Sequence, residues 1–274
     1  MADSNKTWFI TGSSKGFGNL WARAALERGD RVAATARNTA DLASLATEYG
    51  TRVLTLQLDV TDRDAVFATV RQAAEHFGTI DVLVNNAGYG HFGMVEELTE
   101  AEIRSQMETN FFGAVWVTQA VLPIMRAQGS GRILQITSEG GVRAYPGIGA
   151  YHASKWALEG LSESLWQEVE QFGIRVTNVE PGPYDTDWLA TGSRVSPGNP
   201  AYDDVRASTA DGFDVGDAAA TTNAILEIVD TDDAPHRVFL GKTYDAIVPI
   251  YQDRLDTWRR WQPTALAAFG RAGG

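Results

Sequence analysis

The stretch Lys6–Gly18, KTWFITGSSKGFG, sets an apolar run directly before a glycine-rich turn. The run Lys6–Thr11 predicts a buried strand, and Asn19–Arg28 predicts a helix that begins just after the turn. Glycines 12, 16 and 18 permit a tight turn and close approach of the backbone, and the helix N-terminus offers free N–H groups to a pyrophosphate. Three glycines can be only a loop. At the first strand-to-helix turn, however, the pattern favours a nucleotide site.

Strand and helix patterns alternate along the rest of the chain. After the strand Arg31–Ala36, a helix is predicted to run to about Tyr49. Further helices are predicted from Thr61 to Phe77, over Glu100–Met125, from Tyr151 to Val169, and over about Gly216–Val229 as the last helix. Such alternation predicts an α/β fold: one doubly wound domain over residues 1–274, with a seven-stranded parallel sheet and helices on both faces. The further strands are predicted at Arg31–Ala36, Arg52–Leu58, Asp81–Val84, Arg132–Thr137, Ile174–Val179 and Arg237–Leu240.

One long segment carries little periodicity. Residues from about Tyr184 to Asp214 are rich in Gly, Pro, Ser and Asp. A loop of this length inside a compact domain tends to be a lid or a binding segment. We therefore expect residues 184–214 to cover a substrate site.

Composition excludes several classes of protein. A formal net charge of −12 argues against nucleic acid or an anionic membrane as a partner. The chain has no cysteine, which rules out disulfides, thiolate metal sites and cysteine nucleophiles. Its four histidines are too scattered to suggest a metal site, and no apolar run is long enough to span a bilayer. The expectation is a cytoplasmic protein without a metal.

Tyr151 and Lys155 lie four residues apart in a predicted amphipathic helix. Positions i and i+4 share one helix face, so the phenol would lie beside a positive charge. A nearby cation favours the phenolate, which would lower the pKa of Tyr151 and make it a usable acid–base group. A Tyr–Lys pair at this spacing is usually only packing and a solvated charge. Its meaning depends on the rest of the chain.

The end of the second predicted strand bears on the choice of cofactor. Sheets that bind NAD usually place Asp or Glu there for the adenosine ribose. This chain has Ala36 and Arg37 instead, and Lys15 lies in the glycine turn. Two cations and no carboxylate suit a phosphate on the 2′-oxygen of the adenosine ribose, which NADP(H) carries and NAD lacks. The pattern therefore favours NADP(H).

With these residues in view, the chain resembles the short-chain dehydrogenases/reductases (SDR), in the single-domain subgroup of roughly 250 residues. The stretches Tyr151–Gly160 and Glu180–Trp188 further resemble the branch of 17β-hydroxysteroid dehydrogenase-like enzymes. The resemblance covers nearly the whole chain and implies a Rossmann domain. It rests on Thr11-Gly12-x-x-x-Gly16-x-Gly18, Asp59-Val60, Asn85-Asn86-Ala87-Gly88, Asn110, Ser138, Tyr151-x-x-x-Lys155 and Pro181-Gly182.

The resemblance implies a cofactor site and four catalytic residues. Tyr151 would protonate the carbonyl oxygen, Ser138 would donate a hydrogen bond to it, Lys155 would hold the nicotinamide ribose, and Asn110 would anchor a water through its backbone. Taken alone, Ser138 would be read as a cap or turn residue. The cofactor site would comprise Gly12, Ser14, Lys15, Gly16, Phe17, Gly18, Arg37, Asp59, Val60, Asn86, Ala87, Gly88, Tyr151, Lys155, Pro181, Gly182 and Thr186.

The substrate pocket is predicted from residues next to these motifs. Several are aromatic, which favours a hydrophobic or ring-bearing ketone. Glu139 would repel an anionic substrate if it faced inward, but a solvated loop carboxylate is an equal interpretation. The predicted lining is Gly140, Gly141, Tyr145, Tyr184, Trp188, Leu189, His91 and Phe92.

The resulting hypothesis is an NADP(H)-dependent ketoreductase that also runs as an alcohol dehydrogenase. A non-catalytic NADP-sensing module and an isomerase or dehydratase of the extended branch are the rivals. Small residues on the Tyr151 helix permit close helix packing, and the family's equivalent helix forms subunit interfaces, so a homodimer or homotetramer is expected. These small residues are Ala153, Ala157, Gly160 and Ser164.

Overall fold

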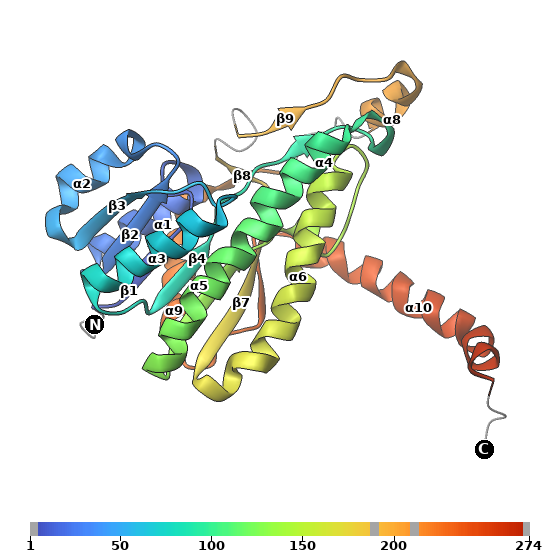
Figure 1. The fold of residues 1–274 in the computed structure, drawn as a ribbon. Coiled ribbons are helices and arrows are strands. Elements are labelled where there is room, and N and C mark those ends of the chain that lie inside the picture. Colours follow the sequence, from blue (N-terminus) through green and yellow to red (C-terminus); the bar gives the residue numbers. More distant parts are fainter. Residues whose placement is uncertain (1–4, 187–191, 209–213, 271–274) are drawn as a thin grey trace.

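The computed structural model describes residues 5–186, 192–208 and 214–270, and its core is a seven-stranded parallel sheet. The strand order is β11-β7-β6-β4-β1-β2-β3, with all neighbours parallel (Figure 1). This confirms the predicted doubly wound α/β fold. The strands are β1 Thr7–Ile10, β2 Arg31–Ala36, β3 Val53–Gln57, β4 Val82–Asn85, β6 Gly131–Ile136, β7 Ile174–Pro181 and β11 Arg237–Leu240.

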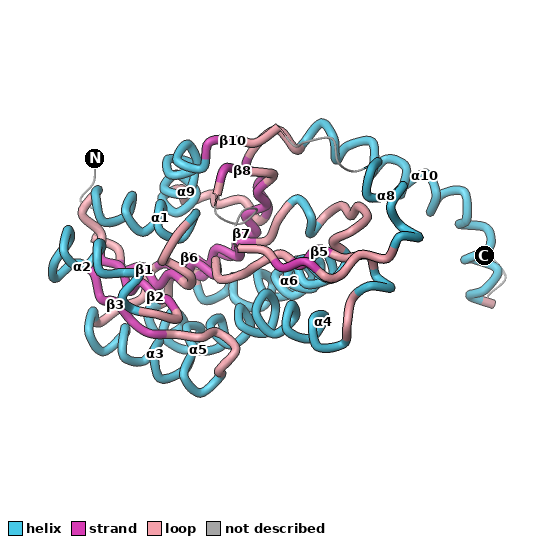
Figure 2. Tube along the Cα trace, turned by 90° about the horizontal axis from the view of Figure 1, so that it is seen from above, coloured by secondary structure: helices cyan, strands magenta, loops and turns pink. Residues whose placement is uncertain are grey.

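Helices cover both faces of the sheet, with α1 and α9 on one side and α3, α5 and α6 on the other (Figure 2). Each face has its own core because successive side chains of a strand point to opposite faces. On β1, Trp8 and Ile10 pack toward α1 and α9, whereas Phe9 packs toward α3 and α5. The helices are α1 Gly16–Glu27, α2 Ala43–Tyr49, α3 Arg63–Phe77, α4 Glu100–Met107, α5 Gly113–Gln128, α6 Gly149–Val169, α8 Asp203–Ser208, α9 Thr221–Asp230 and α10 Tyr244–Phe269.

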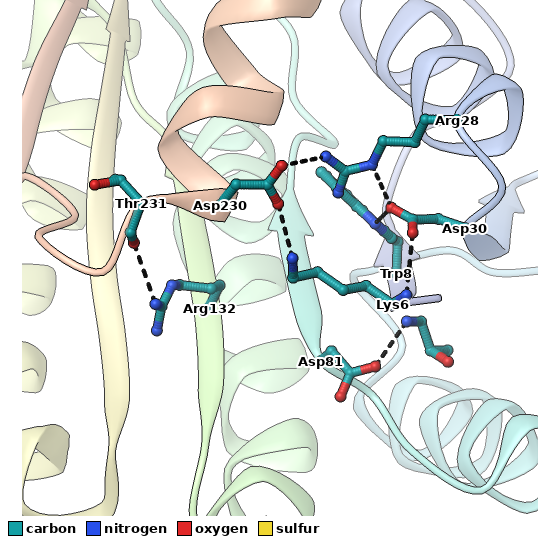
Figure 3. Close-up of polar contacts among 9 residues, drawn as sticks. Lys6, Trp8, Arg28, Asp30, Asp81, Arg132, Asp230 and Thr231 are labelled. Atoms are coloured by element: carbon teal, nitrogen blue, oxygen red, sulfur yellow. Dashed lines mark hydrogen bonds and ion pairs between the residues drawn. The ribbon is translucent and has the colours of Figure 1, made fainter. Parts of the chain in front are cut away.

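Carboxylates tie the amino-terminal edge of the sheet together (Figure 3). Asp30 is fully buried and accepts hydrogen bonds from Lys6 N, Trp8 Nε1 and Arg28 Nε. Lys6 and Arg28 both reach Asp230 at the end of α9, at 2.7 Å each. This edge is therefore closed by ion pairs, and the opposite, carboxyl-terminal edge is the one available for a ligand.

The predicted single helix over Glu100–Met125 is wrong in one respect. A π turn over Glu108–Phe112 separates α4 from α5, and α5 continues to Gln128. From the turn onward the buried face carries Asn110, Ala114, Val117, Val121 and Met125.

Two further differences concern the C-terminal region. Gly216 and Asp217 form a short strand, β10, and the helix that was expected from Gly216 begins at Thr221, after a 3-10 turn. The prediction of a last helix ending near Val229 missed α10, the longest helix described. Pro249 and Pro263 lie inside α10, and proline is a strong signal against a helix interior.

Short strands attach the segment expected to form a lid. Tyr184–Asp185 (β8) pairs with Gly216–Asp217 (β10), and Arg194–Val195 (β9) pairs with His91–Phe92 (β5). His91 Nε2 also lies 2.9 Å from Ser196 Oγ. In its described parts this segment is therefore fixed by both short strand pairs, and Asn199 N and Arg206 Nη1 add a third attachment by donating to Glu97 Oε1 at 2.6 Å each.

Two negative findings concern the residues that the structure describes. None of their helices combines the length and the apolar character needed to cross a membrane. Nor do these residues bring together three or more His, Cys, Asp or Glu side chains in an arrangement that could hold a metal ion.

Candidate active site

A cleft of about 720 Å³ lies at the carboxyl-terminal edge of the sheet. This is where open α/β sheets bind ligands, because the strand-to-helix loops diverge there. Most of the residues selected from the sequence line it: Gly12, Ser14, Lys15, Gly16, Phe17, Arg37, Asp59, Val60, Asn86, Ala87, Gly88, Phe92, Ser138, Glu139, Tyr145, Tyr151, Lys155, Pro181, Gly182, Tyr184 and Thr186.

Some residues that were predicted to form the site lie behind the wall of the cleft, and others lie outside the residues that the structure describes. A Cβ on Gly18 would lie 2.3 Å from Gly12 O, so Gly18 serves the packing of α1 against the turn. Gly140 is buried against His152, whose Nδ1 lies 2.9 Å from Gly140 O. This corrects the prediction that Gly140 lines the substrate pocket. His91 is also buried, and Trp188 and Leu189 lie outside the described residues.

The glycine turn fits a pyrophosphate. Gly12 and Gly16 have φ of 69° and 55°, a region that favours glycine. A Cβ on Gly12 would lie 3.1 Å from Ala87 Cα, so a side chain there would crowd the end of β4. Lys15 is the N-cap of α1 and provides no side-chain cap, which leaves N–H groups of the first turn directed at the cleft.

Two cationic residues line the cleft at the glycine turn and at the end of β2. Arg37 follows β2 directly, Lys15 lies in the glycine turn, and both line the cleft together with Ala36. The Arg37 side chain is exposed, and no hydrogen bond or ion pair with another described residue occupies its guanidinium. The end of β2 therefore offers positive charge where an NAD site usually offers a carboxylate.

Tyr151 and Ser138 meet on the floor of the cleft. Ser138 follows β6 and caps the short turn Glu139–Gly141, accepting a hydrogen bond from Gly140 N at 3.0 Å. Ser138 is therefore both a cap residue of this turn and a lining residue of the cleft. Burial raises the pKa of the Tyr151 phenol above its usual value, and a hydrogen bond with Ser138 opposes that rise. The expected lowering of this pKa by Lys155 is not found: burial outweighs the neighbouring groups.

Lys155 is buried one helical turn after Tyr151. Its Nζ lies 5.7 Å from the centroid of the Tyr151 ring and donates to Ile136 O at 2.7 Å. Burial lowers the pKa of Lys155 to about 8, and the charge of Glu159 opposes that shift. The side chain is therefore charged at neutral pH and close to losing its proton.

Asn110 lies in the π turn, below the cleft. Its Oδ1 accepts from Tyr89 N at 3.0 Å, and its Nδ2 donates to Tyr89 O at 2.9 Å and Ser154 Oγ at 3.1 Å. A Cβ on Gly88 would lie 3.2 Å from Asn110 Oδ1 and 3.6 Å from Lys155 Nζ, so Gly88 lies between the two side chains. π turns recur at functional sites, and this one places a poor helix former beside the lysine.

Glu139 faces the cleft and is buried, so the interpretation as a solvated carboxylate is wrong. It accepts hydrogen bonds from Arg143 at 2.8 Å and Thr243 at 2.9 Å, and Tyr145 Oη lies 3.5 Å away. Burial, followed by the Glu139 charge, raises the pKa of Tyr145 to about 12. Because Arg143 compensates its charge, Glu139 repels an anion less than its position suggested.

Part of the lining of the cleft was not predicted from the sequence. Arg194 Cζ lies 4.6 Å from the centroid of the Tyr89 ring, and the two residues join the β9 segment to the loop after β4. Tyr89 follows the selected Asn86–Gly88 directly, so its place after a strand was the available signal. No pattern pointed to Arg194. The other missed lining residues include Ser105, Glu108, Thr109, Ile148, Pro183 and Ser193.

Comparison with known proteins agrees with this geometry. Residues 6–194 match the family model described as short chain dehydrogenase. Oxidoreductase BOA17 of Botryotinia fuckeliana is 41% identical over 243 residues, which cover 86% of this chain and 89% of that protein. The 3-ketodihydrosphingosine reductase of Bacteroides thetaiotaomicron is 44% identical over 177 residues, 65% of this chain and 63% of that protein.

Solved structures extend the similarity along the chain. A short-chain dehydrogenase from Streptomyces avermitilis superposes with a TM-score of 0.90 at 38% identity, covering 96% of this chain and 98% of that chain. An alcohol dehydrogenase from Thermococcus sibiricus, complexed with 5-hydroxy-NADP, gives a TM-score of 0.72 at 29% identity, covering 86% and 95%.

Fold and site thus define an oxidoreductase built on a dinucleotide-binding sheet. The chain belongs to the short-chain dehydrogenase/reductase family, whose members bind nicotinamide cofactors.

Proposed function

We propose that this oxidoreductase uses NADP(H) to interconvert a ketone and a secondary alcohol. The observation that carries the proposal is the meeting of Tyr151, Ser138 and Lys155 on the floor of one cleft. A non-catalytic sensor has no use for a buried phenol hydrogen-bonded to a serine. The name of the Bacteroides relative, a ketone reductase, supports the same reaction class.

Each residue has a separate task in this proposal. A bound nicotinamide supplies the hydride in reduction and accepts it in oxidation. Tyr151 gives its phenolic proton to the oxygen of the substrate, and its raised pKa keeps that proton in place at neutral pH. Ser138 donates a hydrogen bond to the same oxygen. Lys155 keeps a positive charge beside the phenol, which favours the phenolate left after proton transfer.

The walls near Tyr151 favour a hydrophobic or ring-bearing substrate. Phe92, Tyr145, Ile148 and Pro183 line the cleft, and Tyr184 lines it where its ring lies 5.4 Å from that of Phe17 on α1. Apolar and aromatic walls with a few placed polar groups are typical of small-molecule sites. Resemblance to the 17β-hydroxysteroid dehydrogenase-like branch points the same way and stays a prediction from the sequence.

Turnover with a panel of ketones tests the proposed reaction. NADPH absorbance should fall with bulky aromatic or alicyclic ketones and fall much more slowly with short keto acids. A clear preference for keto acids would contradict the substrate class. NADPH binding without consumption by any ketone would instead favour the sensor, and conversion of a substrate without net change in NADPH would favour the isomerase or dehydratase.

Replacing Arg37 tests the cofactor preference. Arg37→Asp should lower kcat/KM for NADPH by about 10- to 100-fold, the loss expected for one charge-assisted contact to a phosphate. NADH should be affected little. Arg71→Asp on the exposed face of α3 is the matched control and should leave both values unchanged. Equal losses for the two cofactors, or wild-type preference for NADH, would refute the assignment.

We also propose that the chain works as a homodimer or homotetramer in the cytoplasm. On α6, Ala153, Gly160 and Ser164 are exposed, and Ala157 is half-buried. Small exposed side chains permit the close helix–helix approach that an interface through α6 requires.

A further inference from the structure

Helix α10 leaves the body of the protein. Figures 1 and 2 show it extending away from the sheet and its covering helices. Its beginning is fixed to the body: Thr243 Oγ1 donates to Glu139 Oε2 at 2.9 Å, Ile247 is buried, and Arg254 Nη1 donates to Val142 O at 3.1 Å. The side-chain hydrogen bonds of Gln252, Arg259 and Arg260 stay within the helix.

The exposed face of α10 is apolar. Most of the large apolar side chains that the described residues leave exposed lie on this one helix, at 40% to 67% exposure. Positions 244, 248, 251, 255 and 258 are separated by four and three residues in turn, which is the spacing of a coiled-coil seam. The exposed residues are Tyr244, Val248, Tyr251, Leu255, Trp258, Trp261, Leu266 and Phe269.

This face is large enough to hold two proteins together. Five of its side chains are aromatic, and a fully buried aromatic side chain covers about 150–250 Å². At their observed exposure, the aromatic residues and the three aliphatic ones together approach the roughly 800 Å² per partner of a standard interface. An apolar surface of this extent on a soluble protein marks an interaction site.

We propose that α10 pairs antiparallel with α10 of a second copy of this chain. An alternation of four and three residues is the pattern of helix–helix packing, and a membrane-surface helix would carry a broader apolar face opposite a row of Lys and Arg. Residues 244–269 contain three Asp and three Arg, so the acidic excess of the chain lies elsewhere and does not oppose pairing of the helices.

Charge fixes the direction of the pairing. In the antiparallel arrangement, positions that flank the seam on one side face their own kind in the partner. With Gln252 at the two-fold axis, Asp245 of each copy faces Arg259 of the other, which gives two complementary pairs. On the other side of the seam Arg254 meets Arg254 of the second copy, which is one unfavourable contact, whereas a parallel arrangement would set Arg254 against Arg259 twice and would give no complementary pair.

The seam continues onto α6. Arg254 Cζ lies 4.8 Å from the centroid of the Tyr251 ring and 5.0 Å from that of Trp156, which is 40% exposed on α6. Pairing of the helices would therefore also cover the region of Trp156. Trp156 shares a face of α6 with Ala153 and Gly160, three and four residues away, so this pairing would involve the same region of α6 as the interface proposed above.

Light scattering at micromolar concentration tests the pairing. Leu255→Glu/Trp258→Glu places two charges in the seam and should halve the mass of the assembly, whereas Ala246→Glu, on the exposed opposite face of α10, should leave it unchanged. Turnover should be retained in all three proteins, which shows that the body is folded. An equal mass for the double variant and the wild type, including a monomeric wild type, would overturn the proposal.

The absence of cysteine from the chain allows a second, independent test. Gln252→Cys should be joined into covalent dimers by a short bis-maleimide, because residue 252 meets its symmetry mate, and Thr257→Cys should not. Equal cross-linking of both variants would refute the antiparallel arrangement. Sedimentation of a monomeric wild type with phosphatidylserine vesicles would assign the apolar face to a membrane and overturn pairing with a second copy.

Discussion

Tyr151→Phe is expected to reduce kcat for ketone reduction by about 10²- to 10⁴-fold, the usual contribution of a positioned general acid. The phenol is the group on the cleft floor that can give a proton to the substrate oxygen, and its raised pKa keeps it protonated through neutral pH. Removing one oxygen from a buried ring leaves the packing of α6 unchanged. NADPH affinity, measured by fluorescence titration, should therefore stay close to that of the wild type.

Tyr145→Phe is the matched control for this variant. Tyr145 also lines the cleft, and its hydroxyl lies 3.5 Å from Glu139 Oε1. Its loss should change kcat less than 10-fold, since the proton donor is kept. Near-wild-type turnover of Tyr151→Phe, or an equal loss in both variants, would refute the role of Tyr151.

Lys155→Met is expected to lower kcat by at least about 10²-fold and to weaken NADPH binding by about 10- to 100-fold. The positive charge beside Tyr151 would be lost, and with it the proposed contact to the nicotinamide ribose. Lys242→Met removes a lysine that is exposed and should leave both quantities unchanged. A Lys155→Met protein that binds NADPH normally and turns over ketone at the wild-type rate would contradict this role.

The titration of Lys155 should also make ketone reduction depend on pH. Because the pKa of Lys155 is about 8, the wild-type kcat/KM for ketone reduction should fall as pH rises through that value, and the small residual activity of Lys155→Met should not. The free energy of unfolding has the opposite dependence on pH. The folded pKa lies below the ordinary 10.5, so between pH 8 and 10.5 the unfolded chain binds more protons and wild-type stability rises with pH.

Below pH 8 the buried charge costs the fold on the order of 3 kcal/mol, from the size of the pKa shift. Lys155→Met lacks this cost and should be the more stable protein at pH 7, although the lost hydrogen bond to Ile136 O offsets part of the gain. Urea unfolding of both proteins across this pH range measures the difference. A parallel pH dependence in the two proteins would show that the Lys155 charge is not the source.

The periodicity of the chain was enough to predict the sheet. The central strands β1 and β4 are buried on both faces, so a short apolar run bounded by turn residues marks each of them without knowledge of its neighbours. Alternation with helices then requires parallel pairing through crossovers. The glycine turn, Ser138 and Tyr151 were found because each follows or borders such an element in the sequence.

Other features depended on contacts between distant segments. Asn110 was noticed as a poor helix former, but the π turn around it exists through its bonds to Tyr89 and Ser154. Glu139 could be placed next to Ser138, yet only Arg143 and Thr243 show that its charge is buried and compensated. Helix α10 was missed because its two prolines oppose a helix locally and its apolar face has little of the body to cover.

The sequence by itself determined the α/β class of the fold, the nucleotide turn and the spacing of Tyr151 and Lys155 on one helix, because these depend on local periodicity and spacing. The tertiary structure alone decided the protonation of the two residues. Burial removes water from both groups, and it raises the pKa of the phenol and lowers that of the lysine regardless of their spacing on the helix.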